Sequence, residues 1–225
     1  KQKKIVLGVI IGLALLLLLM VIPGLIVYQK SMKLKSAVGV LVAAVKSQNL
    51  PEISKEIGNT KNSLKSLKSS YKLISWIKFI PFLGVYANDL GHALNAGEYG
   101  LEAGEVVLLA VGPYADILGF NGQKEEAGDG TKTAQERIDF IVKSIPSLLP
   151  RIDEITLKIS KIKTELDEIN PEQYPVRVGK NEVRVKVKRG LELFDEGATF
   201  VTNGKPLLEA APYLLGIDEE RQYLL

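Results

Sequence analysis

Residues 138–169 read IDFIVKSIPSLLPRIDEITLKISKIKTELDEI, and this stretch carries the clearest periodic signal in the chain. Its apolar side chains recur every three or four residues, at Ile138, Ile141, Ile145, Leu148, Ile152, Ile155, Ile159, Ile162, Leu166 and Ile169. This spacing places them on one stripe of an α-helix, as in a coiled-coil seam. The stretch therefore predicts a long helix that needs a partner helix, from this chain or from a second copy.

The start of this helix and a bend in it are also predicted. Thr133 and Glu136 form a capping box, which is typical of a helix N-terminus. Pro146 and Pro150 each remove a backbone hydrogen bond, so we expect a kink or a restart near them. The preceding residues 121–130 are rich in glycine and charge, and they predict a solvated loop.

Three earlier segments are also predicted to be helical. Residues 31–48 carry an apolar stripe, and the Asn-Leu-Pro sequence at 49–51 ends it. Apolar residues from Ile53 to Ile74 follow a spacing close to a heptad, and residues 93–108 have Ala and Gly three or four residues apart. Such small residues let helices approach closely. Because short connections favour antiparallel neighbours, we expect the last two segments to pack on the seam 138–169.

A hydrophobic corner separates two of these helices, at Trp76-Ile77-Lys78-Phe79-Ile80-Pro81-Phe82-Leu83-Gly84. Pro81 lacks a backbone N–H and restricts the residue before it, and Gly84 is suited to a positive φ. The corner predicts a turn, with helix resuming near Asn88.

The N-terminal part of the chain has no charged side chain from Ile5 to Val27. About 23 helical residues span roughly 34 Å, enough to cross the hydrocarbon core of a bilayer. The run ends in Tyr28, Gln29 and Lys30, which is typical of a membrane interface and not of a signal-peptide cleavage site. We therefore predict residues 1–29 to be a basic tail and a single transmembrane anchor.

Three lysines precede this segment and three follow it closely, so the positive-inside rule does not decide the orientation of the chain in the membrane. A short tail before a long C-terminal region favours a single-pass protein of the cell membrane with a cytoplasmic N-terminus. Residues 30–216 are then predicted to form an extracytoplasmic helical bundle or stalk. Residues 217–225 are interpreted as the start of a further domain, and we expect the chain to be a piece of a longer protein.

Charge is divided unevenly along the chain, although the net charge is only +3. Residues 30–78 carry ten lysines and two glutamates, whereas residues 79–136 carry nine acids and two lysines. The basic segment Lys30–Lys78 predicts either pairing with the acidic helix or contact with anionic lipid or an anionic wall polymer. Nucleic acid is not an expected partner, because the segment lacks the interleaved aromatic residues of a strand-binding groove.

Residues 171–216 fit two different patterns. Alternating residues from Val176 to Val187, around Gly179, are typical of a β-hairpin. The same stretch also has helical spacing, at Val176, Val183, Val187, Leu191, Phe194, Ala198 and Val201. Periodicity alone leaves both structures open for residues 175–189. Pro206 and Pro212 predict the bounds of a short closing helix.

Two places in the chain resemble a bacterial envelope family known as the domain of unknown function 4012 family. One is Ile80–Gly84 with Asp89-Leu90, and the other is the ending Tyr213–Leu225. The order of parts is also similar: a basic tail, a membrane helix, long helices and a Leu-Gly junction. The resemblance implies that residues 171–216 are helical and that the main domain of the family begins after this chain. It implies no activity and no site residue.

No catalytic, cofactor-binding or metal-binding residue is predicted. The chain has no cysteine, which excludes disulfides and thiol catalysis. Its single histidine, His92, is expected to be exposed or packed between helices, because zinc and haem sites need more ligands. Phosphate-binding loops and the nucleophile elbow are missing from the sequence. Asp218, Glu219 and Glu220 are interpreted as a solvated cap near a helix end.

These observations predict a non-catalytic, membrane-anchored stalk or assembly module of the cell envelope, which projects a C-terminal domain from the cell surface. The expected partners are the lipid bilayer and, in an assembly, a second copy or other envelope proteins. Two alternatives stay open: a membrane-bound sensor or signalling coiled coil, and an accessory subunit of an envelope polysaccharide system.

Overall fold

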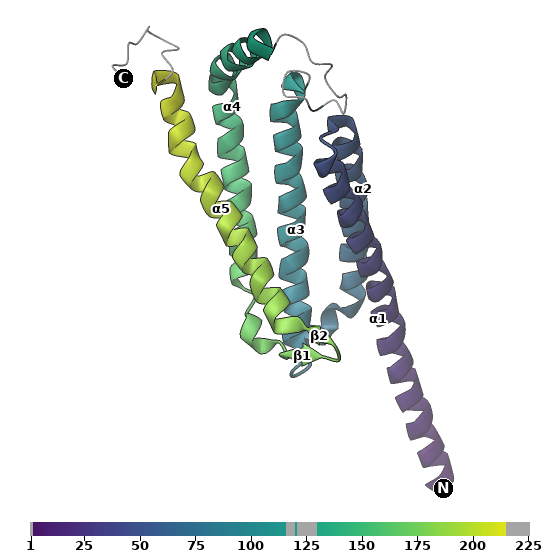
Figure 1. Ribbon diagram of the computed structural model, residues 1–225. Helices are drawn as coiled ribbons and strands as arrows, with labels where there is room; N and C mark the ends of the chain where they lie inside the picture. Colours follow the sequence, from purple (N-terminus) through teal and green to yellow (C-terminus); the bar gives the residue numbers. More distant parts are fainter. Residues whose placement is uncertain (1, 116–119, 121–129, 215–225) are drawn as a thin grey trace.

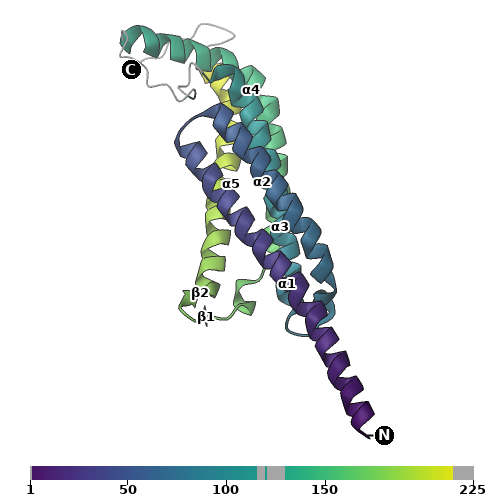
Figure 2. The same ribbon diagram turned by 90° about the vertical axis from the view of Figure 1, so that its right-hand side faces the viewer.

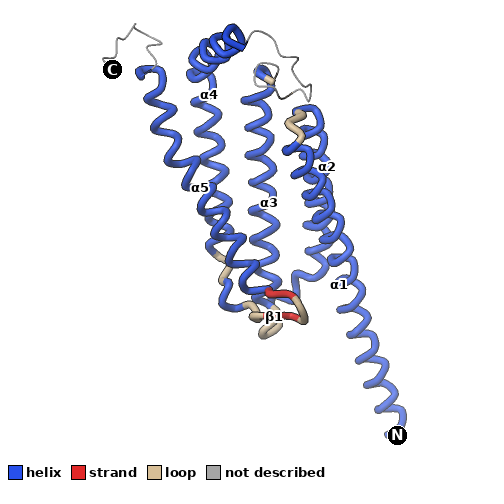
Figure 3. Tube along the Cα trace, in the orientation of Figure 1, coloured by secondary structure: helices blue, strands red, loops and turns tan. Residues whose placement is uncertain are grey.

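The computed structural model describes the backbone of residues 2–115, 120 and 130–214. Side chains are described within these ranges except at positions 2–5, 9, 13–20, 130–143, 145–147 and 212. The described chain is mainly helical, as predicted (Figure 3). Its long helices are α1 (Gln2–Lys46), α2 (Leu50–Tyr71), α3 (Gly84–Val111), α4 (Gly130–Asp167) and α5 (Val183–Leu214). Short 3₁₀ helices are η1 (Lys72–Phe79), η2 (Gly112–Tyr114) and η3 (Pro171–Gln173).

Helices that follow one another in the sequence are neighbours in space, from α1 on one side of the bundle to α5 on the other (Figure 1). Two ion pairs show that α2 and α3 run antiparallel: Lys61 pairs with Glu105, and Lys68 pairs with Glu98. The two pairs are seven residues apart on each helix, in opposite order. The predicted antiparallel bundle of long helices is confirmed.

The connection between α1 and α2 lies where the sequence predicts a break. Gln48 has a φ of 54° and reverses the chain direction. The side chain of Asn49 then accepts a hydrogen bond from the Glu52 N–H at 3.1 Å and caps α2. Pro51 lies in the first turn of α2, where its missing N–H would have no helical partner.

The apolar core lies between α1, α2 and α3 and has two clusters. The larger one contains Val27, Leu64, Leu67, Tyr71, Ile74 and Leu94, and the smaller one contains Ala44, Ile53 and Ile57. Leu101 of α3 packs against both clusters and joins them. The predicted stripe Ile53–Ile74 is therefore a buried face, and its partners are α1 and α3.

Glycines on α3 allow close packing inside the bundle, as the small-residue spacing predicts. A Cβ atom at Gly104 would lie 3.3 Å from the Cδ1 atom of Ile57 on α2. A Cβ atom at Gly100 would lie 4.0 Å from the Cδ1 atom of Ile162 on α4. The helix is thus fitted against neighbours on two sides, and a larger side chain at Gly104 would push α2 away.

The seam 138–169 packs differently from the prediction. Helix α4, which contains most of the seam, lies against α3 and α5. Ile162 of α4 is buried, and so is Ile169, which follows the end of the helix. The predicted contact with α3 is confirmed, whereas the contact with the stripe Ile53–Ile74 is wrong. That stripe is covered by α1 instead, through residues such as Leu34 and Leu41.

Helix α4 bends sharply between its first turns and the rest (Figure 2). Pro146 and Pro150 lie within it, and the kink that they predict is confirmed. The helix begins at Gly130, three residues before the predicted capping box. The capping side chains and the predicted loop 121–129 lie outside the described residues.

Both interpretations of residues 171–216 are right in part. Strands β1 (Arg177–Val178) and β2 (Asn181–Glu182) form a short antiparallel hairpin, with Gly179 at φ 60° in the turn. Helix α5 then starts at Val183, so the predicted second strand is wrong beyond residue 182. The helix continues through Pro206 to Leu214, and no separate closing helix occurs in the described chain. After the hairpin ends at residue 182, the chain follows the helical spacing of its apolar residues.

The hydrophobic corner forms a turn, as predicted, but the residue with a positive φ is not the predicted one. Phe82, and not Gly84, has a positive φ, of 67°. A non-glycine residue in this region costs about 1–2 kcal/mol. Gly84 is needed for a different reason, because a Cβ atom there would lie 2.3 Å from the Lys78 carbonyl oxygen. Helix α3 starts at Gly84, earlier than the predicted Asn88.

The packing of α4 leads to a first prediction. Replacing Ile162 by Asp buries an unpaired carboxylate between α3 and α4, at a cost of several kcal/mol. We expect the full chain in detergent to lose helicity and unfold at a much lower urea concentration, as followed by circular dichroism. The matched control is Thr164→Asp, at an exposed position of the same helix, which should unfold near the wild-type midpoint. A variant that stays folded but changes from dimer to monomer would show that the seam joins two copies instead.

Candidate functional site

Helix α1 extends well beyond the bundle toward the N-terminus (Figure 1). Val27 is buried in the larger apolar cluster and marks where α1 enters the bundle; we call this the exit end. Most of the described apolar side chains before it are exposed, and only those next to the bundle, such as Ile26, are partly buried. The exposed ones are Val6, Leu7, Ile10, Ile11, Val21, Ile22 and Leu25. The part of α1 that projects from the bundle is therefore apolar, and most of its described side chains are exposed.

Among the described residues, no helix offers the length of apolar sequence that a membrane crossing requires. The leucine-rich centre of the predicted anchor, residues 13–20, lies outside the described side chains. The predicted anchor therefore stays a prediction.

Lysines close to the exit end have no carboxylate partner in the described chain. Lys30, Lys33 and Lys35 of α1 make no ion pair there, whereas Lys61 and Lys68 of α2 both pair with glutamates of α3. Pairing of the basic segment with the acidic helix is thus confirmed for α2. The lysines of α1 keep their charge available for another anion.

His92 is half-buried on α3, where the sequence predicts an exposed or packed histidine. Its Nδ1 atom lies 2.8 Å from Glu165 Oε2 on α4, and the Asn95 side chain donates to Glu165 Oε1 at 3.1 Å. Among the described residues, its hydrogen-bond partner is Glu165 alone, so no serine or threonine hydroxyl is paired with it. This cluster ties α3 to α4.

A second ion pair ties the same two helices together, between Glu102 and Lys158. The hydrogen bond to Glu102 raises the pKa of Lys158 above its ordinary value. Lys158 is partly exposed, so the pair contributes more to the register of α3 and α4 than to stability.

A buried carboxyl group closes the exit end of the bundle. Asp89 of α3 is only 5 % exposed, and its Oδ2 atom accepts a hydrogen bond from the Tyr174 hydroxyl at 2.8 Å. Burial, and then this bond, raise the pKa of Tyr174. The ring of Tyr174 also meets that of Tyr86 edge to face, with centroids 5.3 Å apart. These contacts fasten the segment before the hairpin to α3.

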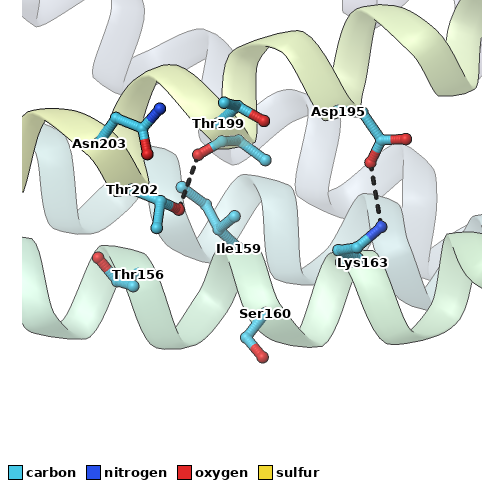
Figure 4. Close-up of a pocket in the computed structure, with 9 residues that line it drawn as sticks. Thr156, Ile159, Ser160, Lys163, Asp195, Thr199, Thr202 and Asn203 are labelled. Carbon is cyan, nitrogen blue, oxygen red and sulfur yellow. Dashed lines mark hydrogen bonds and ion pairs between the residues drawn. The ribbon is translucent and has the colours of Figure 1, made fainter.

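A groove of about 520 Å³ lies between α4 and α5 (Figure 4). Its polar lining consists of Thr156, Ser160, Lys163, Asp195, Thr199, Thr202 and Asn203. The hydroxyls of Thr156 and Thr202 donate at 2.8 Å to carbonyls one turn back in their own helices. Lys163 pairs with Asp195 at 3.2 Å across the groove. Two of the lining hydroxyls are thus bonded within their own helices, and the Lys163–Asp195 ion pair links α4 to α5.

A second, apolar groove of about 550 Å³ lies between α1, α2 and α3. Its apolar walls include Leu34, Val38, Leu64, Leu67, Leu90 and Leu101. Thr60 also lines it, is only 1 % exposed, and has no hydrogen-bond partner for its hydroxyl. An unsatisfied buried hydroxyl costs about 1–3 kcal/mol.

No group of three or more potential metal ligands converges within the described chain. The predicted acidic cap at residues 218–220 lies outside the described residues. Sequence reasoning named Asp89 only as part of the motif that resembles the family, with no structural role, and it did not single out Tyr174 or Thr60. A polar residue at an apolar position of a helix is the signal that could have found Asp89 and Thr60. Tyr174 has no comparable signal, because its contact with Asp89 spans 85 residues.

The Asp89 contact leads to a second prediction. Tyr174→Phe keeps the ring but leaves the Asp89 carboxyl buried without its donor, which should cost about 1–3 kcal/mol at pH 7. Because folding raises the Tyr174 pKa, this contribution is present below about pH 10, the ordinary tyrosine value, and is lost as the pH rises above it. Urea unfolding at pH 7 and pH 11 measures both effects. The control is Tyr86→Phe, whose hydroxyl bond to the Gln173 carbonyl is exposed and should matter less.

A third prediction concerns the unsatisfied hydroxyl of Thr60. Thr60→Val keeps the shape of the side chain and removes the buried polar atom, so the protein should become more stable by about 1 kcal/mol. The control is Thr164→Val, which removes an exposed hydroxyl that donates to the Ser160 carbonyl at 3.0 Å and should give no gain. Urea unfolding of the two variants compares them directly, and a loss of stability in Thr60→Val would show that the hydroxyl has a partner.

No family model, curated protein or solved structure matches this chain. The resemblance to the domain of unknown function 4012 family therefore stays a prediction, which rests on the short motifs in residues 80–90 and 213–225.

Proposed function

We propose that the protein is a non-catalytic, membrane-anchored stalk or assembly module of the cell envelope. In this proposal residues 5–27 cross the cell membrane once, the N-terminus is cytoplasmic, and the bundle stands outside the membrane. The observation that carries the proposal is the continuity of α1, which runs from the apolar segment into the bundle without a break.

The position of the exit end supports this arrangement. The apolar segment of the sequence ends at Val27, and Val27 is also the residue at which α1 becomes buried in the bundle. The helix leaves the bundle at the end of its apolar segment, so no flexible linker separates the bundle from the proposed anchor. The bundle would therefore stand directly on the membrane surface.

The unpaired lysines of α1 indicate the first partner. Lys30, Lys33 and Lys35 follow the apolar segment directly, at the depth of the lipid headgroups in this arrangement. A lysine near an anionic membrane surface gains about 1 kcal/mol. We therefore assign this part of the basic segment to anionic lipid. The lysines of α2 that pair with α3 serve the bundle instead.

Support for a stalk comes from the shape of the bundle and from its chemistry. The helices run side by side along one direction, so they carry the chain away from the exit end and back (Figure 2). The polar groups of the described grooves and helix interfaces are bonded mainly to one another, which suits a structural element. The proposal assigns recognition or chemistry to other proteins or domains of the assembly.

The absence of cysteine allows a direct test of topology, which is the fourth prediction. Single cysteines are introduced at Gln2 and at Asn203, which is exposed on α5. In intact cells, a membrane-impermeant maleimide should label Asn203→Cys, whereas Gln2→Cys should react only after lysis. Both variants should stay in the membrane pellet after carbonate extraction.

The outcomes separate the parts of the proposal. Labelling of Gln2→Cys but not Asn203→Cys in intact cells would reverse the orientation and favour a cytoplasmic sensor. Release of both variants from the pellet by carbonate would contradict the anchor itself. Wild-type protein, which has no thiol, is the control for unspecific labelling.

A further inference from the structure

A cluster of exposed aromatic and aliphatic side chains lies at the exit end of the bundle. It consists of Leu73, Trp76, Phe79, Phe82 and Leu83, from η1 and the turn that follows it, and we call it the aromatic corner. Phe79 is 88 % exposed and Phe82 is 91 % exposed, among the highest values for large apolar residues of the described chain. Such a patch marks a surface that meets another apolar phase.

The aromatic corner lies beside the point where α1 leaves the bundle. Ile74 of η1 is buried in the same apolar cluster as Val27 of α1, and Ile77 packs against that cluster. The short hairpin of β1 and β2 lies at the same end of the molecule (Figure 1). The corner is therefore set at the level where the proposed anchor would enter the bilayer.

The backbone holds Phe82 outward at an energetic cost. Its positive φ of 67° is unfavourable for phenylalanine and acceptable for glycine. The Gly84 N–H donates to the Ile80 carbonyl at 2.9 Å and closes the turn around it. A strained residue that contributes almost nothing to the core is typical of a functional position. A glycine at position 82 would serve the turn better, so its aromatic ring calls for a reason outside the fold.

The segment that forms the aromatic corner, residues 72–84, contains two lysines, Lys72 and Lys78, and no acidic residue. In the described chain, Lys72 and Lys180 have no carboxylate partner, and Lys78 lies over the Tyr71 ring at 5.4 Å from its centroid. The nearby acids of the hairpin region, Glu172 and Glu182, are already paired with arginines. Exposed aromatics among unpaired lysines suit the interface of an anionic bilayer, where rings and ammonium groups both find partners.

We propose that the aromatic corner is a second membrane contact, which inserts Trp76, Phe79 and Phe82 into the headgroup region of the bilayer that α1 crosses. This inference rests on the proposed membrane anchoring and adds a lateral contact to it. We prefer the bilayer to a second copy of the chain for two reasons. The corner lies beside the residue at which the apolar segment of α1 ends, and its unpaired charges are positive. Two copies would place these lysines opposite one another.

The chain offers its own probe, since Trp76 is its single tryptophan and is 41 % exposed. The full chain is reconstituted into vesicles of phosphatidylcholine and phosphatidylglycerol, with the phosphatidylcholine brominated either near the headgroup or near the chain ends. Bromine quenches tryptophan only at short range. We expect the shallow bromines to reduce the emission of Trp76 by about twofold or more, and the deep ones to reduce it less.

Two variants separate insertion from folding. Phe82→Gly relieves the positive φ, so it should raise the urea midpoint while it weakens the quenching of Trp76. Phe79→Ser combined with Phe82→Gly should abolish most of the quenching. The matched control is Phe200→Ser on α5, because Phe200 is 81 % exposed but does not belong to the corner. It should leave the quenching unchanged.

Each outcome has a definite meaning for the proposal. Vesicle flotation is measured first, and protein that does not float would contradict the anchoring itself. Floating protein whose Trp76 emission is unaffected by bromine would overturn the second contact and leave the anchor intact. Equal quenching in the wild type and the double variant would overturn insertion of the two phenylalanines. Unquenched wild type that is dimeric in sedimentation, with a monomeric double variant, would assign the corner to a second copy.

Discussion

The close approach of α3 to its neighbours is the constraint on which the rest of the bundle depends. Gly104 leaves room for Ile57 of α2, because a Cβ atom there would be unusually close, and Gly100 faces Ile162 of α4 at an ordinary contact distance. Burial of apolar side chains supplies the main stabilisation, at about 25 cal/mol per Å². Because α3 is packed between α2 and α4, α1 can cover the apolar face of α2 and α3, and α5 can lie against α4. A row of consecutive helices follows from this central contact.

Ion pairs along α3 then select one arrangement among the alternatives. Partly exposed pairs such as Lys61–Glu105 and Lys158–Glu102 each add little stability. They are matched at the spacing of helical turns, however, so a shift of α2 or α4 by one turn would leave several charges facing the wrong residues. The division into a basic and an acidic segment therefore acts mainly on register. The lysines of α1, which follow no such pattern, are left for another partner.

Much of this architecture could be predicted from the sequence, since the helices, their breaks and the packing role of the small residues are local patterns. The partner of the seam 138–169 could not be predicted fully, because α1 and α4 both carry stripes that suit α2. The hairpin was ambiguous because residues 176–187 satisfy periods of two and of 3.6 residues together. The contact of Asp89 with Tyr174 and the positive φ of Phe82 depend on tertiary placement, which no local pattern reports.

Because α1 is one continuous helix from the apolar segment into the bundle, the structure at the exit end affects how the bundle would stand on a membrane. If one helix were the whole anchor, the bundle could tilt and could rotate about the axis of that helix. The aromatic corner lies to one side of α1, on the connection between α2 and α3. If it rests in the headgroup region, two separate points hold the bundle, and rotation about α1 would lift the corner out of the lipid. The strained Phe82 then has a physical role that packing does not provide: it fixes the orientation in which the bundle stands on the membrane.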